Sequence, residues 1–180
     1  CQGSTERCGR RFEYDGLASC AAAQLLQAGE KDCLYGCLGY GDCARVCPFD
    51  AITVDEGRIP VINWDRCTGC GACVRACPRN LIETLPNNIP WYVACSSQDK
   101  GKAVKDVCQV GCIACWICVK QSGEACIEKN GNLPRLKYGK ECDYSKAAEK
   151  CPMRCFIPVT PPLVSVRAPA AKEAAAAAAG

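Results

Sequence analysis

The sequence contains no histidine among its 180 residues, and it has only three Phe, three Trp and one Met. The absence of histidine excludes zinc sites of the two-cysteine, two-histidine kind, Rieske-type ligation and catalysis by a histidine base. Large apolar side chains are scarce, because the 49% apolar fraction counts every cysteine and an alanine-rich end. We therefore expect a small hydrophobic core that needs help from something other than side-chain packing.

Long apolar runs and nucleotide-binding motifs are absent as well. No stretch of about 18 apolar residues occurs, so the sequence contains no candidate membrane-spanning helix, and no signal-peptide pattern is present. A phosphate-cradling glycine loop, a dinucleotide fingerprint and a nucleophile–base pair are also missing. We therefore expect no catalytic residue in this chain, and any NAD or flavin chemistry on partner proteins. The net charge of +3 comes without a basic, aromatic stripe and gives no support for nucleic-acid binding.

Cysteine is abundant, with 20 residues, and the stretch CTGCGACVRACP at 67–78 shows how it is used. Sites built only from cysteine select zinc, Cu(I) or iron–sulfur. In bacterial ferredoxins, three cysteines of such a run hold one [4Fe–4S] cluster and the fourth, before proline, holds another. A zinc knuckle needs only two CxxC pairs, and a disulfide framework needs an oxidising compartment. The complete run favours [4Fe–4S] clusters over both.

The partner half of this run lies upstream, at 33–52, and it is incomplete. Counting back from Cys47-Pro48 puts Tyr40 where the middle ligand should be. We expect Cys33, one helical turn before Cys37, to replace it. The predicted ligands of cluster 1 are Cys33, Cys37, Cys43 and Cys77. Those of cluster 2 are Cys47, Cys67, Cys70 and Cys73.

A second, damaged copy of the pattern follows, because 107–127 echoes 32–52. The position of its fourth ligand is Ser122, and the answering half at 141–156 has Ser145 and Ala148 where ligands are expected. One cluster of this pair should be lost. The other, cluster 3, is predicted to use Cys112, Cys115, Cys118 and Cys151, with Cys155 as the alternative to Cys151.

The remaining cysteines allow a further site. Cluster 4 would use Cys1, Cys20, Cys95 and Cys108. The alternative is that these are free buried thiols, or ligands to a cluster on an upstream segment. No role is assigned to Cys8, Cys126, Cys142 or Cys155. The sequence thus predicts three [4Fe–4S] clusters, and a fourth if the second set is a site.

These patterns predict an α+β fold of tandem bacterial ferredoxin-like units with small two-stranded sheets, short helices and a cluster-centred core. The segment between the first two cysteine runs indicates strand, turn and strand, with the turn at Asp55, Glu56 and Gly57. The predicted parts are a cysteine-containing segment 1–32, a first unit 33–86 with two clusters, a degenerate unit 87–157 and a Pro/Ala-rich tail 158–180.

Three stretches give the sequence a family resemblance: RRFEYDGLASCAAAQLLQAGEKDCLYGCLGYGDCARVCPFDAI, then RCTGCGACVRACPRNLI, then ACSSQDKGKAVKDVCQVGCIAC. Together they resemble the B subunit of the Rnf-type ferredoxin:NAD oxidoreductase, over roughly residues 1 to 155. The resemblance implies an electron-transfer subunit of a membrane-bound complex that moves Na⁺ or protons. It also implies reduced ferredoxin as electron donor, other subunits as partners, and a place at the cytoplasmic face of the bacterial membrane, reached through an upstream helix or through partner subunits.

Two other functions remain open from the sequence. The same polyferredoxin could serve a soluble flavin-dependent or electron-bifurcating oxidoreductase, which an upstream apolar helix of about 20 residues would argue against. A zinc-stabilised interaction module is the alternative of a different class, and zinc without acid-labile sulfide would identify it.

Overall fold

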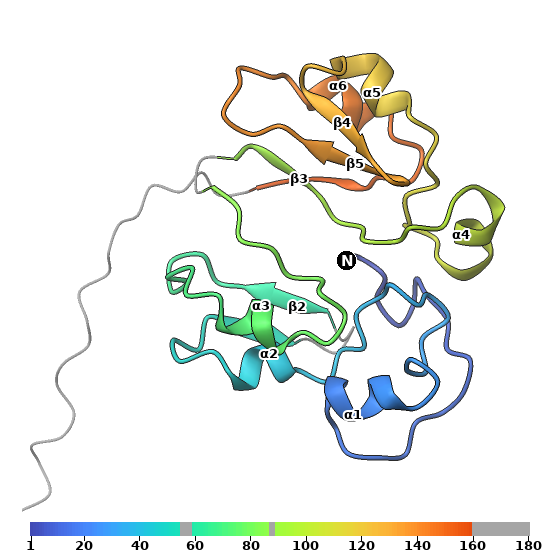
Figure 1. Cartoon of the computed structure of the whole chain (residues 1–180), viewed down its shortest axis with the longest axis vertical. Helices are drawn as coiled ribbons and strands as arrows, with labels where there is room; N and C mark the ends of the chain where they lie inside the picture. Colours follow the sequence, from blue (N-terminus) through green and yellow to red (C-terminus); the bar gives the residue numbers. More distant parts are fainter. Residues whose placement is uncertain (55–58, 87–88, 160–180) are drawn as a thin grey trace, which may run out of the picture.

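The computed structural model describes residues 1–54, 59–86 and 89–159. Two units with the same order of elements follow one another along the chain (Figure 1). The first unit consists of α2 (Asp42–Arg45), β1 (Ile52–Val54), β2 (Pro60–Ile62) and α3 (Ala72–Ala76). The second consists of α5 (Ile117–Ser122), β4 (Ile127–Asn130), β5 (Leu133–Leu136) and α6 (Ser145–Glu149). Helix, hairpin and helix therefore recur, as the repeat in the sequence suggests.

Each hairpin is an antiparallel pair, with Ile52 opposite Ile62 in the first and Ile127 opposite Leu136 in the second. Both strands predicted between the first two cysteine runs are confirmed. Their turn, at Asp55, Glu56 and Gly57, lies outside the described residues, as does the predicted tail beyond residue 159. The small two-stranded sheets with short helices confirm the α+β class, while the pairing of two clusters in each unit stays a prediction.

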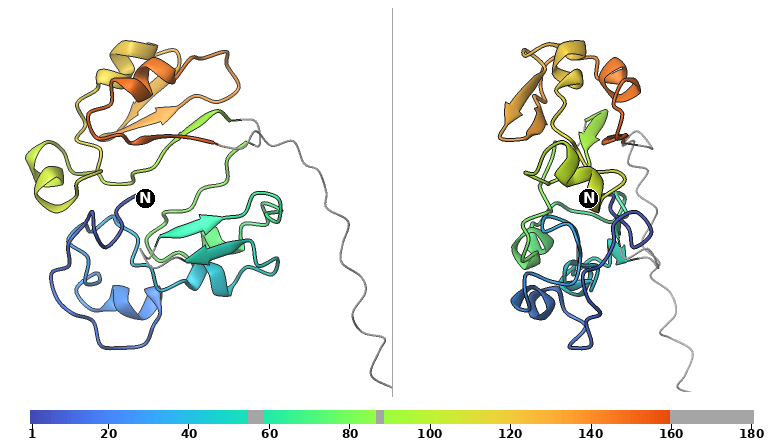
Figure 2. Two further views of the ribbon diagram at one scale, coloured as in Figure 1. Left: turned by 180° about the vertical axis from the view of Figure 1, so that it is seen from behind. Right: turned by 90° about the vertical axis from the view of Figure 1, so that its right-hand side faces the viewer.

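The remaining helices and strands of the described residues lie outside these two units. Strand β3 (Trp91–Val93) pairs antiparallel with β6 (Phe156–Pro158) and so joins the two ends of the second unit. Helix α4 (Lys102–Val107) stands to the side, and α1 (Cys20–Leu25) lies in the N-terminal segment (Figure 1). The views of Figure 2 agree with Figure 1 in placing the N-terminus between the two units. The N-terminal segment is thus part of the fold.

An apolar cluster fills the second unit. Ile127 and Ala147 have no exposed surface, and Tyr144 and Phe156 are also buried within it. Ala148, at one position where the degenerate unit lacks a ligand, packs against this cluster. The second unit therefore has an apolar core of its own, while the loss of its second cluster stays a prediction.

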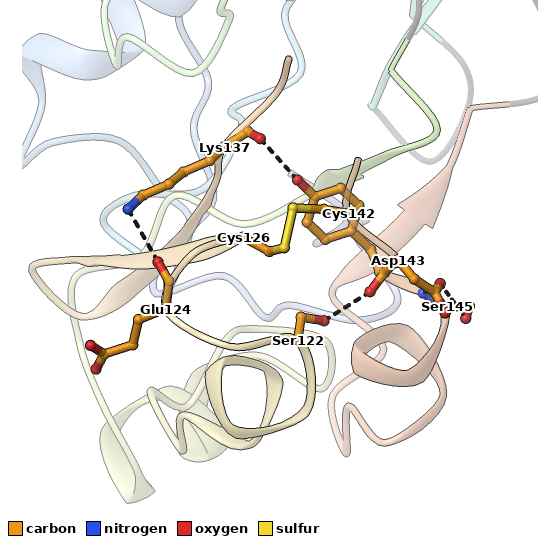
Figure 3. The surroundings of a disulfide bond; sticks show 8 residues. Ser122, Glu124, Cys126, Lys137, Cys142, Asp143 and Ser145 are labelled. Carbon is orange, nitrogen blue, oxygen red and sulfur yellow. Dashed lines mark hydrogen bonds between the residues drawn. A yellow bond between two sulfur atoms is a disulfide. The ribbon is translucent and has the colours of Figure 1, made fainter. Parts of the chain in front are cut away.

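A disulfide and a hydrogen bond also join parts of the second unit (Figure 3). Cys126 and Cys142 form a disulfide, and both pack against the apolar cluster. The hydroxyl of Ser122 donates a hydrogen bond to the carbonyl of Asp143 at 3.1 Å. Ser122 stands at one predicted ligand position of the cluster that the sequence suggests is lost. The structure thus gives Ser122 another partner.

None of the helices in the described residues is long and apolar enough to cross a membrane.

Candidate metal centres

Three loops share a backbone conformation that suits an anionic iron–sulfur cluster. In each loop the residues on either side of the middle ligand position have positive φ, between 55° and 79°. These pairs are Gly39 and Gly41, Gly69 and Gly71, and Ala114 and Trp116. Alternation of this kind turns successive N–H groups into a concave nest, as at many Fe–S sites. The loop around Tyr40 keeps this conformation although its middle ligand is missing.

Trp116 shows that the fold imposes this conformation. A bulky residue rarely adopts a φ of 60°, because its Cβ crowds the backbone. The ammonium group of Lys129 lies over the Trp116 ring, 5.5 Å from its centroid, and this cation–π contact stabilises the observed orientation of the indole. The strained backbone at Trp116 is therefore tolerated in a loop whose shape the ligands of cluster 3 require.

The three cysteines that precede proline also share a geometry. Each thiol accepts a hydrogen bond from the backbone N–H four residues later, at 3.4 Å in every case. The residue before each donor has a φ between 46° and 51°. The pairs are Cys47 with Ala51, Cys77 with Leu81, and Cys151 with Cys155. Hydrogen bonds to ligand sulfur raise the reduction potential of a cluster, so this turn both positions and tunes the ligand.

The structure brings Cys20 to the predicted ligands of cluster 1. Burial raises the pKa of the Cys43 thiol to about 11, and the negative charges of Cys37, Cys20 and Cys77 add to this effect. Burial also raises the pKa of Cys37, with a contribution from Cys20. A cavity of about 1090 Å³ is lined by Cys20, Cys37, Cys43 and Cys77, together with Cys1 and Cys95.

Asp42 holds Cys20 in this place. Its carboxylate accepts hydrogen bonds from the backbone N–H groups of Cys20 and Ala21, both at 3.0 Å, and from the Ser19 hydroxyl at 3.1 Å. Burial opposes ionisation of Asp42, but these hydrogen bonds outweigh it and hold the pKa of the carboxyl below its usual range. Because Asp42 precedes Cys43, one side chain fixes the start of α1 beside the cluster 1 loop.

Cys33 belongs to a different group. Its pKa is raised first by burial and further by Cys108 and Cys95. Residues 33–36 form a turn, in which Gly36 donates its N–H to the Cys33 carbonyl at 3.0 Å. No helical turn therefore joins Cys33 to Cys37, and the place of Cys33 in cluster 1 stays a prediction.

Cys8 lies in the group of Cys33. It is 2% exposed, and a bridge pairs its backbone with that of Cys108. The Cys108 thiol donates a hydrogen bond to the Cys8 sulfur and, with the N–H of Cys33, lowers the pKa of Cys8 to about 7 despite burial. The same contact raises the pKa of Cys108. Spacing along the chain gave no signal of this group, because its members come from three distant segments.

Tyr40 has a structural partner. Its hydroxyl donates a hydrogen bond to the carboxylate of Glu30 at 2.8 Å, and the Glu30 side chain is 2% exposed. At the position where a ligand is missing, Tyr40 thus contacts the N-terminal segment.

The predicted ligands of cluster 2 lie near the surface. Cys67 and Cys70 are exposed, and Cys73 is partly buried at the start of α3. Burial raises the pKa of Cys73, and the charges of Cys67 and Cys70 raise it further. Cys47 follows α2, and α2 packs against α3.

The predicted ligands of cluster 3 are brought together. Burial raises the pKa of Cys118 to about 11, and the charges of Cys112, Cys115 and Cys151 contribute. All four line one small cavity with Cys155. Cys155 is 1% exposed, and its thiol lies within hydrogen-bonding reach of both Cys112 and Cys151, to either of which its single proton can be donated. This donor lowers the pKa of Cys112 to about 7 and that of Cys151 to about 6.

The cysteine groups supply thiolates, which are the ligands of [4Fe–4S] clusters. Among the described residues, no group of three or more His, Cys, Asp or Glu side chains is placed to hold a single metal ion. Loops with inward N–H groups and a cysteine-lined cavity suit such a cluster.

Comparisons with known proteins support this chemistry. Residues 60–83 match the 4Fe-4S binding domain family. The chain is 41% identical to the B subunit of the Na(+)-translocating ferredoxin:NAD(+) oxidoreductase complex of Acetobacterium woodii, over 87% of this chain and 47% of that protein. It is 36% identical to the B subunit of the ion-translocating oxidoreductase complex of Methanosarcina acetivorans, over 87% and 59%.

A third relative is the B subunit of the proton-translocating ferredoxin:NAD(+) oxidoreductase complex of Clostridium ljungdahlii, 39% identical over 84% of this chain and 54% of that protein. The chain spans about half the length of the curated relatives it matches. The domain match and the cysteine run together identify an iron–sulfur protein that binds [4Fe–4S] clusters.

Proposed function

Because this chain belongs, over most of its own length, to the family of B subunits of ion-translocating ferredoxin:NAD⁺ oxidoreductase complexes, we propose that it relays single electrons within such a complex. A bound [4Fe–4S] cluster accepts or donates one electron. The chain's own contribution is to hold the clusters in sequence, to exclude water and to set their potentials.

The four cysteine groups supply the proposed ligands. Clusters 2 and 3 keep the sets given by the sequence. Cluster 1 takes Cys20, Cys37, Cys43 and Cys77, because Cys20 lines the same cavity as the other three and interacts electrostatically with Cys37 and Cys43. Cluster 4 takes Cys8, Cys33, Cys95 and Cys108, because Cys8 is paired with Cys108 and hydrogen-bonded by the Cys33 backbone, and Cys33 interacts electrostatically with Cys95 and Cys108. Cys20 and Cys33 thus exchange places relative to the sequence-based sets, and Cys8 replaces Cys1.

Contacts between neighbouring groups give the relay an order, and this is the observation that supports the function best. Clusters 2 and 1 share the packed pair α2 and α3. Clusters 1 and 4 meet at Lys31, whose ammonium group interacts with Cys37 and Cys8. Clusters 4 and 3 meet where Cys112 donates its N–H to the Cys95 sulfur at 3.3 Å. The proposed order is 2–1–4–3.

Both ends of this order reach the surface. Cys67 and Cys70 of cluster 2 are exposed at one end, and Cys115 of cluster 3 is exposed at the other. Cys43 and Cys108, of the two middle groups, are buried. Exposed ends with buried middle positions suit a protein that takes electrons from one partner and passes them to another.

The partners follow from the relatives' names. We assign reduced ferredoxin as the electron donor and other subunits of the complex as acceptors, at the cytoplasmic face of the membrane. The NAD site then lies outside the chain given. The relatives are named for different coupling ions, Na⁺ and protons, so the ion is left unassigned.

Anaerobic electron transfer from ferredoxin tests the function. Chemically reduced ferredoxin is mixed with the oxidised chain, and loss of the visible iron–sulfur absorbance is followed by stopped flow. We expect transfer that saturates with ferredoxin concentration. Clusters that dithionite reduces but ferredoxin does not would contradict the assignment of the donor. Zinc without sulfide in the purified chain would contradict the function altogether.

A further inference from the structure

We propose that Lys31 is a fixed positive charge between clusters 1 and 4, and that it raises the reduction potentials of both so that neighbouring clusters can hold electrons together. The inference rests on the proposed function, because it needs both clusters to be present. Lys31 itself is no ligand. Its effect on electron transfer would be electrostatic.

The position of Lys31 is the first observation. The side chain is 5% exposed, although lysine is almost never fully buried without partners. Its Nζ donates a hydrogen bond to the Cys37 carbonyl at 2.8 Å and another to the Gly3 carbonyl. Cys37 is a proposed ligand of cluster 1, so one hydrogen bond points to that cluster's loop.

The other hydrogen bond points to cluster 4. A Cβ atom at Gly3 would lie 3.3 Å from the Cβ of Cys8 and 3.6 Å from the Sγ of Cys108. Gly3 therefore lies against two proposed ligands of cluster 4. Since the same ammonium group binds carbonyls from both loops, it stands at the boundary of the two groups.

The lysine side chain has little freedom to leave. An isolated antiparallel bridge pairs its backbone with Arg10, and its carbonyl accepts a hydrogen bond from Arg11 Nε at 3.3 Å. A Cβ atom at Gly36 would lie 3.1 Å from Cδ of Lys31, so the stem packs closely against this turn. The ammonium group is thus held by its stem as well as by its hydrogen bonds.

The charges that surround Lys31 are mostly negative. The thiols of Cys8, Cys37, Cys108 and Cys33 all interact with it. Arg79 is the neighbouring cation, and it donates hydrogen bonds to the carbonyls of Cys33, Gly36 and Ala28 and to Gln24. The buried carboxylate of Glu30 interacts with Arg79. Arg79 thus interacts with the thiols of Cys33 and Cys37 as well as with Glu30, and it is a second cation beside these groups.

The consequence follows from electrostatics. A [4Fe–4S] cluster on four thiolates is an anion, and reduction adds one more negative charge. A second anion nearby opposes that reduction, whereas a buried cation favours it, and buried charges are screened little by salt. Lys31 lies between two such anions, so it should both raise the two potentials and weaken the repulsion between two reduced clusters.

Potentiometric titration followed by EPR tests the inference, with iron and sulfide content as an independent measurement. Lys31→Met removes the charge and the hydrogen bonds, Lys31→Gln removes the charge but keeps an N–H donor, and Lys31→Arg keeps the charge. Lys105→Met removes an exposed lysine of α4 and is the matched control.

We expect both neutral variants to keep full iron and sulfide while clusters 1 and 4 become at least about tenfold harder to reduce, which is about 59 mV for one electron. The shift should persist in high salt. The potentials of clusters 1 and 4 in Lys31→Arg should return most of the way to the wild-type values. Lys105→Met should leave all potentials unchanged, and the potentials of clusters 2 and 3 should be the same in every variant.

Several results would overturn the inference. Full clusters with unchanged potentials in Lys31→Gln would do so, as would a Lys31→Arg variant that behaves like Lys31→Met. Selective loss of clusters 1 and 4 in both neutral variants but not in Lys31→Arg would support it, because assembly would then need the charge. Loss in all three variants would overturn it. Absence of clusters from the wild-type chain would contradict the proposed function instead.

Discussion

Cys8 and Cys108 lie side by side, joined by an isolated antiparallel bridge between their backbones and by a hydrogen bond between their thiols. This pair ties the N-terminal segment to the segment that follows α4. A cluster held there would lie between the two units, and its ligands would come from parts of the chain that no local motif connects.

The first prediction concerns this pair. Cys8→Ser should cost one Fe₄S₄ unit per chain, because a buried serine cannot replace the thiolate. Native mass spectrometry of the anaerobically purified chain measures the loss directly. Cys1→Ser is the matched control and should keep every cluster. If Cys1→Ser loses a cluster and Cys95→Ser does not, the fourth ligand of cluster 4 is Cys1 and our set is wrong.

The second prediction concerns cluster 1. Cys20→Ser should remove this cluster, and Asp42→Ala should lower its occupancy, because the carboxylate that fixes the start of α1 is gone. Loss of a cap of this kind costs about 1 kcal/mol. The iron content and the EPR spectrum of the reduced chain show the effect. If the Cys20→Ser chain has the wild-type spectrum, Cys20 is not a ligand, and Cys33 is the better candidate for cluster 1.

The sequence was most informative where ligands follow one another in a fixed local pattern. The run from Cys67 to Cys77 and the loop of cluster 3 were visible from spacing, as were the strands around residue 55 and the damaged second unit. Tyr40 was also recognised as a gap. These features depend on turns of a few residues, which spacing and proline or glycine positions report well.

The remaining ligands depend on tertiary contacts. Cys20 lies beside the predicted ligands of cluster 1, where Asp42, far along the chain, accepts a hydrogen bond from its amide. The segment of Cys33 forms a turn and not a helix, so helical spacing does not report its place relative to Cys37. The Cys126–Cys142 disulfide likewise joins residues that lie on either side of the second hairpin in the sequence. Nothing in the local pattern of residues encodes such contacts.

The third prediction concerns that disulfide. Replacing both Cys126 and Cys142 by serine should lower the free energy of unfolding by about 3 kcal/mol, since the bond closes a loop with a sequence separation of 16. Urea denaturation without reductant measures the difference. Adding a dithiol should lower the free energy of unfolding of the wild-type chain to that of the variant. Loss of iron in the variant would show that these cysteines are ligands after all.

The fourth prediction concerns the pH dependence of Cys151 in the metal-stripped chain. The second unit should keep its fold there, because an apolar cluster and the disulfide support it. The hydrogen bond from Cys155 lowers the pKa of Cys151 to about 6, against an ordinary value near 9. Only the thiolate is alkylated, so its rate should rise with pH around 6 and level off by pH 8.

Cys155→Ala provides the control for this prediction. Without the S–H donor, burial remains and raises the pKa of Cys151, so the midpoint of alkylation should move upward. Mass spectrometry of the labelled peptide follows each site. An unchanged midpoint would show that Cys155 does not donate to Cys151.

Chemical analysis of the anaerobically purified chain for iron, zinc and acid-labile sulfide tests the account most directly. Four [4Fe–4S] clusters predict about sixteen iron and about sixteen sulfide per chain, with little zinc. Zinc without sulfide, or cysteines joined as disulfides throughout, would contradict it.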